Sequence, residues 1–135
     1  MISIRVSQDQ VGQAYQELAH YFERDRLENH RATQEDEYHL VLSGDAQLWI
    51  SIDDGAVTGA AITRIFDYPQ APTLVILTMA GDGSDWNTLI QDLELFAANA
   101  GCTHLEIMGR RGWLRRLSGF EESFTTICKR LTHVS

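Results

Sequence analysis

Four arginines gather around one tryptophan near the C-terminal end of the sequence and form its only basic cluster. On a helix they would spread over about half of the circumference, because two adjacent pairs are five positions apart. Such a cluster can clamp an anionic ligand, meet an acidic patch of a partner, or bind nucleic acid with the indole stacked on a base. It can also be a solvated face that pairs with the protein's own carboxylates, and we favour this interpretation. The residues are Arg110, Arg111, Arg115 and Arg116, with Trp113 between them.

Three carboxylates are the best candidates for a general base that accepts the proton of an amine. Asp53 and Asp54 precede a glycine, so turn chemistry explains them better. Glu106 lies in the expected strand His104–Met108, where burial would raise the pKa of its carboxyl group. An arginine partner would explain a buried Glu106 equally well.

Histidine and cysteine offer no metal centre. The five histidines are scattered, and none stands at a metal-site spacing from Cys, Asp or another His. Cys102 and Cys128 are expected to be small apolar fillers, which would be neighbours if the last two strands pair. We therefore predict no bound metal.

Length, composition and charge exclude several classes of protein. The chain has 135 residues, 44% of them hydrophobic, which is enough for one domain with a real core. Its net charge of −8 disfavours non-specific binding to nucleic acid, although residues 110–135 are locally basic. No apolar run approaches the roughly 20 residues of a membrane helix, and the N-terminus does not resemble a secretory signal. A cytoplasmic protein is the expectation.

Hydrophobic periodicity predicts strands that alternate with helices. One helix should open at Ser7 in a capping box with Gln10, a second at Thr33, and a third near Trp86, which Gly101 ends. A short helix is expected over Arg110–Leu117. The expected strands are Ile2–Val6, Ala46–Ile52, Ala56–Phe66, Thr73–Ala80, His104–Met108 and Phe120–Leu131.

Two local signals refine this pattern. Asp54-Gly55 indicates a tight hairpin between the second and third strands. Gly59 inside a strand indicates a bulge or a close backbone approach. Central hairpins followed by α/β crossings predict a single α/β (α+β) domain over residues 1–135, with a mixed sheet and helices on both faces.

The order of elements resembles the fold of the GNAT (Gcn5-related N-acetyltransferase) family over nearly the whole chain. The specific stretch is Ala80–Phe120, which ends in a short helix followed by Gly119-Phe120. A group of small GNAT-like proteins from tailed phages and prophages is more similar still. Its marks are a Trp after the Gly-rich loop, a Phe-Ala near the helix end and a Gly-Arg-x-Gly-Trp block, which here are Trp86, Phe96-Ala97 and Gly109–Trp113.

The resemblance implies an acetyl-CoA site between the fourth strand and the third helix. GNAT enzymes hold the pyrophosphate there on backbone N–H groups, commonly within Arg/Gln-x-x-Gly-x-Gly/Ala. This chain has Thr78 at the Arg/Gln position, and the acids Asp82 and Asp85 would repel the phosphates. Helix capping by Ser84 or Asp85 is the competing role. The implied cofactor-binding residues are Gly81, Asp82, Gly83, Ser84 and Asp85, with Arg110, Arg111 and Arg116.

The resemblance also shows what is missing. Many GNAT enzymes have a Tyr five residues before the Phe of the Gly-Phe pair, where it protonates the leaving thiolate, and here that residue is Arg115. An Asn is often found near the end of the fifth strand, where this chain has Met108-Gly109. Arg115 could stabilise a thiolate electrostatically but is a poor proton donor. The weak catalytic candidates are therefore Glu106 and Arg115.

Two classes of function follow from the resemblance, and the sequence leaves open whether the domain is an enzyme. We favour a divergent GNAT-like domain that has lost standard acetyltransferase activity, such as a phage- or prophage-encoded interaction or virion-associated protein. The alternative is an acetyl-CoA-dependent N-acyltransferase of unknown acceptor. Nucleic-acid binding rests on the arginines alone and is the weakest class. No residue specifies a homodimer, although a sheet edge or the Trp-bearing surface could form one.

Overall fold

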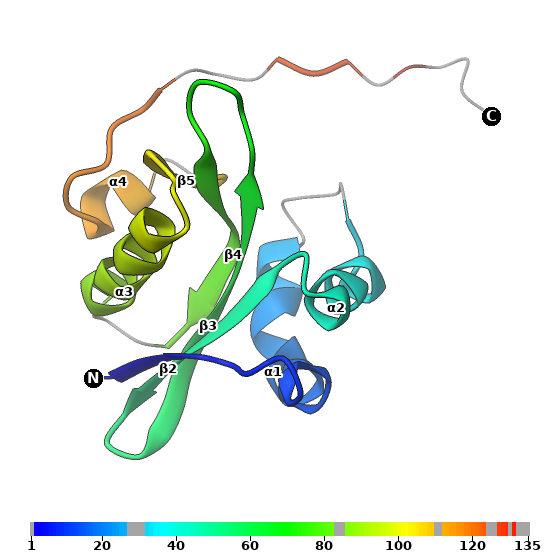
Figure 1. Cartoon of the computed structure of the whole chain (residues 1–135). Coiled ribbons are helices and arrows are strands. Elements are labelled where there is room, and N and C mark those ends of the chain that lie inside the picture. Colours follow the sequence, from blue (N-terminus) through cyan, green and yellow to red (C-terminus); the bar gives the residue numbers. More distant parts are fainter. Residues whose placement is uncertain are drawn as a thin grey trace.

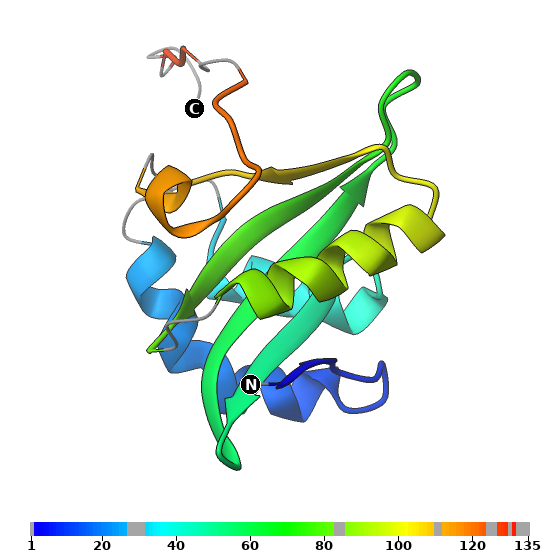
Figure 2. The same cartoon turned by 90° about the vertical axis from the view of Figure 1, so that its left-hand side faces the viewer.

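The computed structural model describes residues 2–26, 32–82, 86–109, 112–123, 127–129 and 131. Within them, five strands form one sheet in the order β1-β2-β3-β4-β5, and helices lie on both of its faces (Figures 1 and 2). The strands are β1 (Ile2–Arg5), β2 (Gln47–Asp53), β3 (Ala56–Phe66), β4 (Thr73–Gly81) and β5 (His104–Ile107). The helices are α1 (Val11–Arg26), α2 (Gln34–Ser43), α3 (Trp86–Asn99) and α4 (Trp113–Arg116).

The sheet is mixed, as the sequence predicts. Strands β1 to β4 pair antiparallel, whereas β4 and β5 are parallel and α3 connects them. Helices α1 and α2 cover one face, and α3 covers the other (Figure 1). This arrangement confirms the predicted α/β class, because a parallel pair requires a crossover, whereas hairpins join the antiparallel strands.

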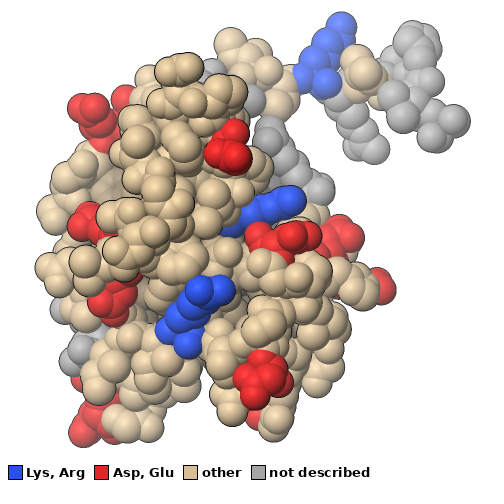
Figure 3. Space-filling model, viewed as in Figure 1, with Lys and Arg blue, Asp and Glu red and all other residues tan. Residues whose placement is uncertain are grey.

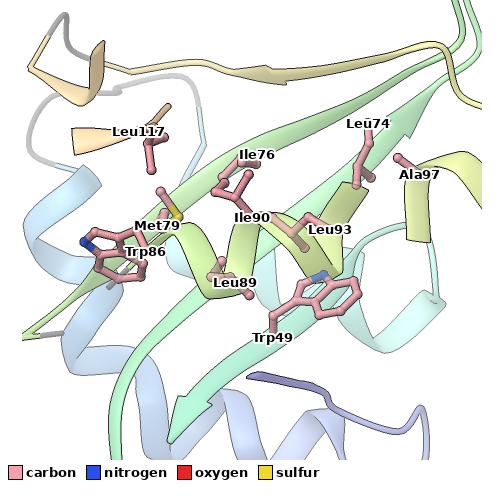
Figure 4. Packing of buried hydrophobic residues seen from close by; sticks show 11 residues of the cluster. Trp49, Leu74, Ile76, Met79, Trp86, Leu89, Ile90, Leu93, Ala97 and Leu117 are labelled. Atoms are coloured by element: carbon pink, nitrogen blue, oxygen red, sulfur yellow. The ribbon is translucent and has the colours of Figure 1, made fainter. Parts of the chain in front are cut away.

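The core on the α3 face is centred on the buried side of α3. Trp49 of β2 lies in it, and its indole Nε1 donates to Thr63 Oγ1 at 2.9 Å. The Thr63 hydroxyl in turn donates to Gln47 Oε1 at 2.8 Å, so this chain of buried polar groups is satisfied. Figure 4 shows the apolar members around it: Leu74, Ile76, Met79, Trp86, Leu89, Ile90, Leu93, Ala97 and Leu117.

Helices α1 and α2 form the second core against the opposite face of the sheet. Its largest fully buried side chain is Phe22, whose ring stacks on that of Tyr15 with centroids 5.5 Å apart. Val41 of α2 and Leu48 of β2 are also fully buried there. Leu42 of α2 is exposed, whereas Glu37 of the same helix is buried.

A capping box starts α2. The Thr33 hydroxyl accepts from Asp36 N at 3.2 Å, and the Thr33 N–H donates to Asp36 Oδ2 at 2.9 Å. The hydrogen bond from the Thr33 backbone lowers the pKa of the Asp36 carboxyl group. At the other end, Gly44 adopts φ 86° and closes the helix.

We expect Thr33→Ala to lower the free energy of unfolding by about 1 kcal/mol, because the Asp36 N–H loses its acceptor. Urea denaturation at pH 7 measures this loss, and Thr58→Ala on β3 is a control outside any helix cap. Because the pKa of Asp36 is lowered in the folded protein, its contribution is complete above the ordinary carboxyl pKa. It disappears as the pH falls through the lowered value. An undiminished stability of Thr33→Ala would contradict the prediction.

The hairpin between β2 and β3 combines a left-handed turn with a bulge. Asp54 and Gly55 have φ of 52° and 78°, as the predicted two-residue turn requires. The pairing of Ser51 with Gly59 is followed by that of Ile52 with Val57, so Thr58 is the extra residue. The signal given by Gly59 is thus confirmed as a bulge.

Two predictions at the ends of elements are wrong. Ser7 does not cap α1, which begins at Val11; its hydroxyl contacts Gln10 Oε1 at 3.2 Å, and the Gln10 N–H bonds the Ser7 carbonyl. Phe120–Leu131 is not a closing strand in its described residues. Phe120 packs on the α3 core, and the chain then leads away from the sheet (Figures 1 and 2), with Ile127 94% exposed. No helix of the described residues is long and apolar enough to cross a membrane.

Candidate functional site

Strands β4 and β5 part halfway along β4. Their parallel pairing runs from Thr73 and His104 to Ile76 and Ile107, and the Met108 N–H still donates to the Ile76 carbonyl at 3.3 Å. Beyond this point β4 continues to Gly81. Among the described residues, this half of β4 pairs only with β3, and β5 leads away from its other edge (Figure 2).

A bulge in β4 lies where the two strands part. Ile62 of β3 is opposite Thr78 and Thr63 is opposite Ile76, so Leu77 has no partner on β3. A bulge bends the strand and re-aims the backbone groups next to it. The parting of β4 from β5 is therefore built into the sheet by one extra residue.

The structure places only part of the predicted phosphate-binding pattern. Thr78 lies inside β4, as predicted, opposite Ile62 of the α1 face, with its hydroxyl buried and without a hydrogen-bond partner. Gly81 is the last residue of β4. The Asp82 N–H, which the resemblance offers to a phosphate, donates instead to the Thr58 carbonyl at 2.8 Å. The predicted loop residues Gly83, Ser84 and Asp85 lie outside the described residues.

Trp86, the first residue of α3, packs tightly against β3. A Cβ on Gly59 would lie 2.9 Å from Cη2 of its ring, so only glycine lets the indole approach this closely. The ring of Trp113 meets that of Trp86 edge to face, with centroids 5.7 Å apart and planes at 84°. Trp113 in turn rests on Gly109, where an added Cβ would lie 3.0 Å from its Cδ1. The two tryptophan rings thus pack in a row between Gly59 of β3 and Gly109, which follows β5.

The short helix α4 is held to the start of α3 by one side chain. Asn87 Oδ1 accepts hydrogen bonds from the backbone N–H and the hydroxyl of Ser118, both at 3.3 Å. Leu117 is buried in the α3 core beside this contact. Sequence reasoning did not single out Asn87 or the pairing of the two tryptophans, although Gly59 within a strand was the signal for the tight approach of Trp86.

The structure describes only two of the four arginines of the predicted cluster. Arg110 and Arg111 lie outside the described residues, whereas Arg115 and Arg116 are exposed on α4. The Arg116 guanidinium lies 5.8 Å from the ring centroid of Trp113, within cation–π range. Acidic side chains are scattered over the visible face of the molecule (Figure 3), so its surface does not form a broad basic patch there.

Glu106 is placed next to the parting of the strands. It pairs with Val75, one position before the last pair of β5. Its neighbours Leu105 and Ile107 pack on the α3 core, so by alternation Glu106 faces the α1 side. It is half-buried, and its strand lies at the edge of the described sheet, because Phe120–Leu131 does not pair beside it in its described residues.

The histidines, cysteines and remaining acids do not form a further site within the described residues. Within the described residues, no three His, Cys, Asp or Glu side chains are grouped so that they could hold a metal ion. Burial, and secondarily the charge of Asp67, raises the pKa of the Cys102 thiol, which disfavours a reactive thiolate. The strand pairing that would have made Cys102 and Cys128 neighbours is absent from the described residues.

Solved structures of acetyltransferases share this fold. An aminoglycoside acetyltransferase from an uncultured soil metagenomic sample, in complex with sisomicin, superposes with a TM-score of 0.71 at 14% identity, covering 97% of this chain and 96% of that one. A ribosomal-protein-alanine N-acetyltransferase from Brucella melitensis biovar Abortus gives 0.63 at 14% identity, covering 96% and 100%.

A GNAT family acetyltransferase from Staphylococcus aureus also gives a TM-score of 0.63 at 14% identity, covering 96% of this chain and 98% of that one. The sequence matches no protein-family model and no curated protein. The chain therefore has the fold of GNAT acetyltransferases, at identities that show the fold alone.

Proposed function

We propose that this protein binds acetyl-CoA between β4 and β5 and transfers the acetyl group to an amine. The observation that carries the proposal is the parting of the two strands at Ile76 and Ile107, beside a bulge, from where β4 continues to Gly81 ahead of α3. The free edge of β4 can pair with an extended chain of amides, as sheet edges do with peptides. The pantetheine arm of CoA is such a chain. The structural likeness to acetyltransferases supports the same conclusion.

The described residues fit this ligand in part. The start of α3 carries a buried polar atom without a partner, Trp86 Nε1. Such a group in a folded protein calls for an explanation, and a ligand with an acceptor would supply one. Thr78 Oγ1 is also unpartnered, but it lies on the α1 face of β4. Acetyl-CoA would supply an acetyl group activated as a thioester. The protein would orient the amine and accept its proton. Glu106 is the candidate base because it lies one position before the residue at which β5 parts from β4.

The first test is binding. At a CoA concentration about 100 times the dissociation constant, binding adds about 2.7 kcal/mol to the free energy of unfolding. We therefore expect acetyl-CoA at millimolar concentration to raise the melting temperature by several degrees, and calorimetric titration to give a dissociation constant. Adenosine at the same concentration is the control. No shift and no heat of binding would refute the proposal.

A second prediction concerns Glu106. If it accepts the amine proton, Glu106→Gln lowers the acetylation rate by about 10²-fold or more and leaves the affinity for acetyl-CoA unchanged. Release of the CoA thiol with a panel of polyamines and aminoglycosides as acceptors gives the rate. Glu94→Gln, on the exposed side of α3, is the matched control. An unchanged rate would remove Glu106 from the proposed mechanism.

A second candidate function is a non-catalytic GNAT-like domain, such as a phage- or prophage-encoded interaction or virion-associated protein. Two observations favour it: Arg115 is exposed at the position of the usual acid, and the Asp82 N–H is already bonded to Thr58. This candidate predicts that no acceptor is acetylated, whether or not CoA binds. Turnover with any amine would refute it.

A further inference from the structure

The indole N–H of Trp86 is a buried donor without an acceptor. Trp86 is 3% exposed, and its Nε1 has no hydrogen-bond partner. A buried N–H without an acceptor is costly, and such groups are rare in folded proteins. Trp49 in the same core shows the ordinary arrangement, since its Nε1 donates to Thr63.

The position of the ring explains where this donor points. The benzene edge of Trp86 rests on Gly59, so the nitrogen lies on the side of the ring away from β3. Figure 4 shows the nitrogen at the edge that points away from the other labelled side chains of the core. Since Trp86 is the first residue of the 14-residue helix α3, the donor stands at the positive end of the helix dipole.

Trp113 packs against Trp86 and is the less buried of the two rings. It is half-buried, and it belongs to a helix of only four residues that is tied to α3 through Asn87 and Ser118. The edge-to-face contact adds to the apolar area that the two rings bury, and Trp113 also contacts Gly109 and the Arg116 guanidinium. Moving Trp113 aside gives up part of these contacts, and a hydrogen bond from Trp86 to a charged acceptor offsets that loss.

We propose that the Trp86 indole N–H donates a hydrogen bond to a phosphate oxygen of the CoA nucleotide, and that Trp113 moves aside to admit this group. The inference rests on the proposed function and assigns a ligand-binding residue within that site. The Asp82 N–H is not available to a phosphate, because it donates to the Thr58 carbonyl, whereas the Trp86 indole at the start of α3 is a donor without an acceptor. The phosphate, in turn, satisfies an atom that is unpartnered in the free protein.

The decisive measurement is the indole region of a ¹H–¹⁵N NMR spectrum of the full chain, in which the three tryptophans give three signals. We expect saturating CoA to move the Trp86 signal downfield, to shift that of Trp113, and to leave that of Trp49 in place. Pantetheine, which has no phosphate, should not move the Trp86 signal. A Trp86 signal that stays in place while CoA is bound would overturn the inference but not the proposed function.

Matched substitutions supply the second readout. Trp86→Phe should raise the dissociation constant for CoA about tenfold, the cost of losing one hydrogen bond to a charged acceptor. Trp49→Phe should leave that constant unchanged but lower the melting temperature, because Thr63 loses its donor. Equal CoA affinities in both variants would overturn the inference. No binding of CoA by the wild-type protein would refute the proposed function itself.

Discussion

Replacement of Gly81 by alanine should be among the most destabilising single changes in this chain. A Cβ at this position would lie 2.3 Å from the Thr58 carbonyl oxygen and 2.4 Å from the Gly59 Cα, and both are backbone atoms that no rotamer change can move. The backbone φ of 155° adds strain for any side chain. We expect a loss of about 3–5 kcal/mol, a large part of the 5–15 kcal/mol that holds a typical domain folded.

The control for Gly81→Ala is Gly101→Ala at the end of α3. Gly101 also has a positive φ, of 84°, but nothing lies within 4 Å of an added Cβ. Only the conformational cost of about 1–2 kcal/mol should therefore appear there. Guanidinium denaturation of both variants separates the two effects. Equal losses would show that β3 and β4 do not approach as closely at Thr58 and Gly81 as the structure has them.

Leu93→Ala should destabilise the protein by about 2–5 kcal/mol, because Leu93 is fully buried at the centre of the α3 core and its loss leaves a cavity. Leu95 lies two residues further along the same helix and is 64% exposed. Leu95→Ala should change stability by no more than about 0.5 kcal/mol. Thermal and chemical denaturation compare the pair, and similar losses in the two variants would mean that α3 is rotated about its axis.

Most of the sheet could be predicted from the sequence because its signals are local. Asp54-Gly55 has the chemistry of a two-residue turn, and β3 has the bounds expected from the apolar run that follows it. The apolar periodicity of α3 and the N-cap at Thr33 predicted helices for the same reason. In each case a few neighbouring residues carry the whole of the physical argument.

The errors occurred where structure depends on a partner elsewhere in the chain. Strand propensity measures the fit of a residue to a half-buried pleated surface, and Ile127 has no such surface against it. The face occupied by Glu106 likewise depends on its register with β4.

The candidate site could be predicted only through the family resemblance, and its placement between the fourth strand and the third helix stays a prediction. The parting of β4 from β5 depends on the register of the two strands, which no local signal in the sequence carries. The contact between Trp86 and Trp113 could not be predicted, since the two residues belong to different helices and each ring packs on a glycine from another part of the chain. Contacts between elements of this kind require the tertiary arrangement.

The pairing of β1 fixes an order on events during synthesis. Its partners on β2 are residues 49–52, and Ser3 also bonds Asp92 of α3. Strand β1 is synthesised before β2, so it cannot pair until β2 has left the ribosome. Its hydrogen bond to Asp92 forms later still, because α3 follows β2 in the chain. A bulky group fused ahead of Ile2 would hinder β1 from docking and leave the edge of β2 open to association with other nascent chains.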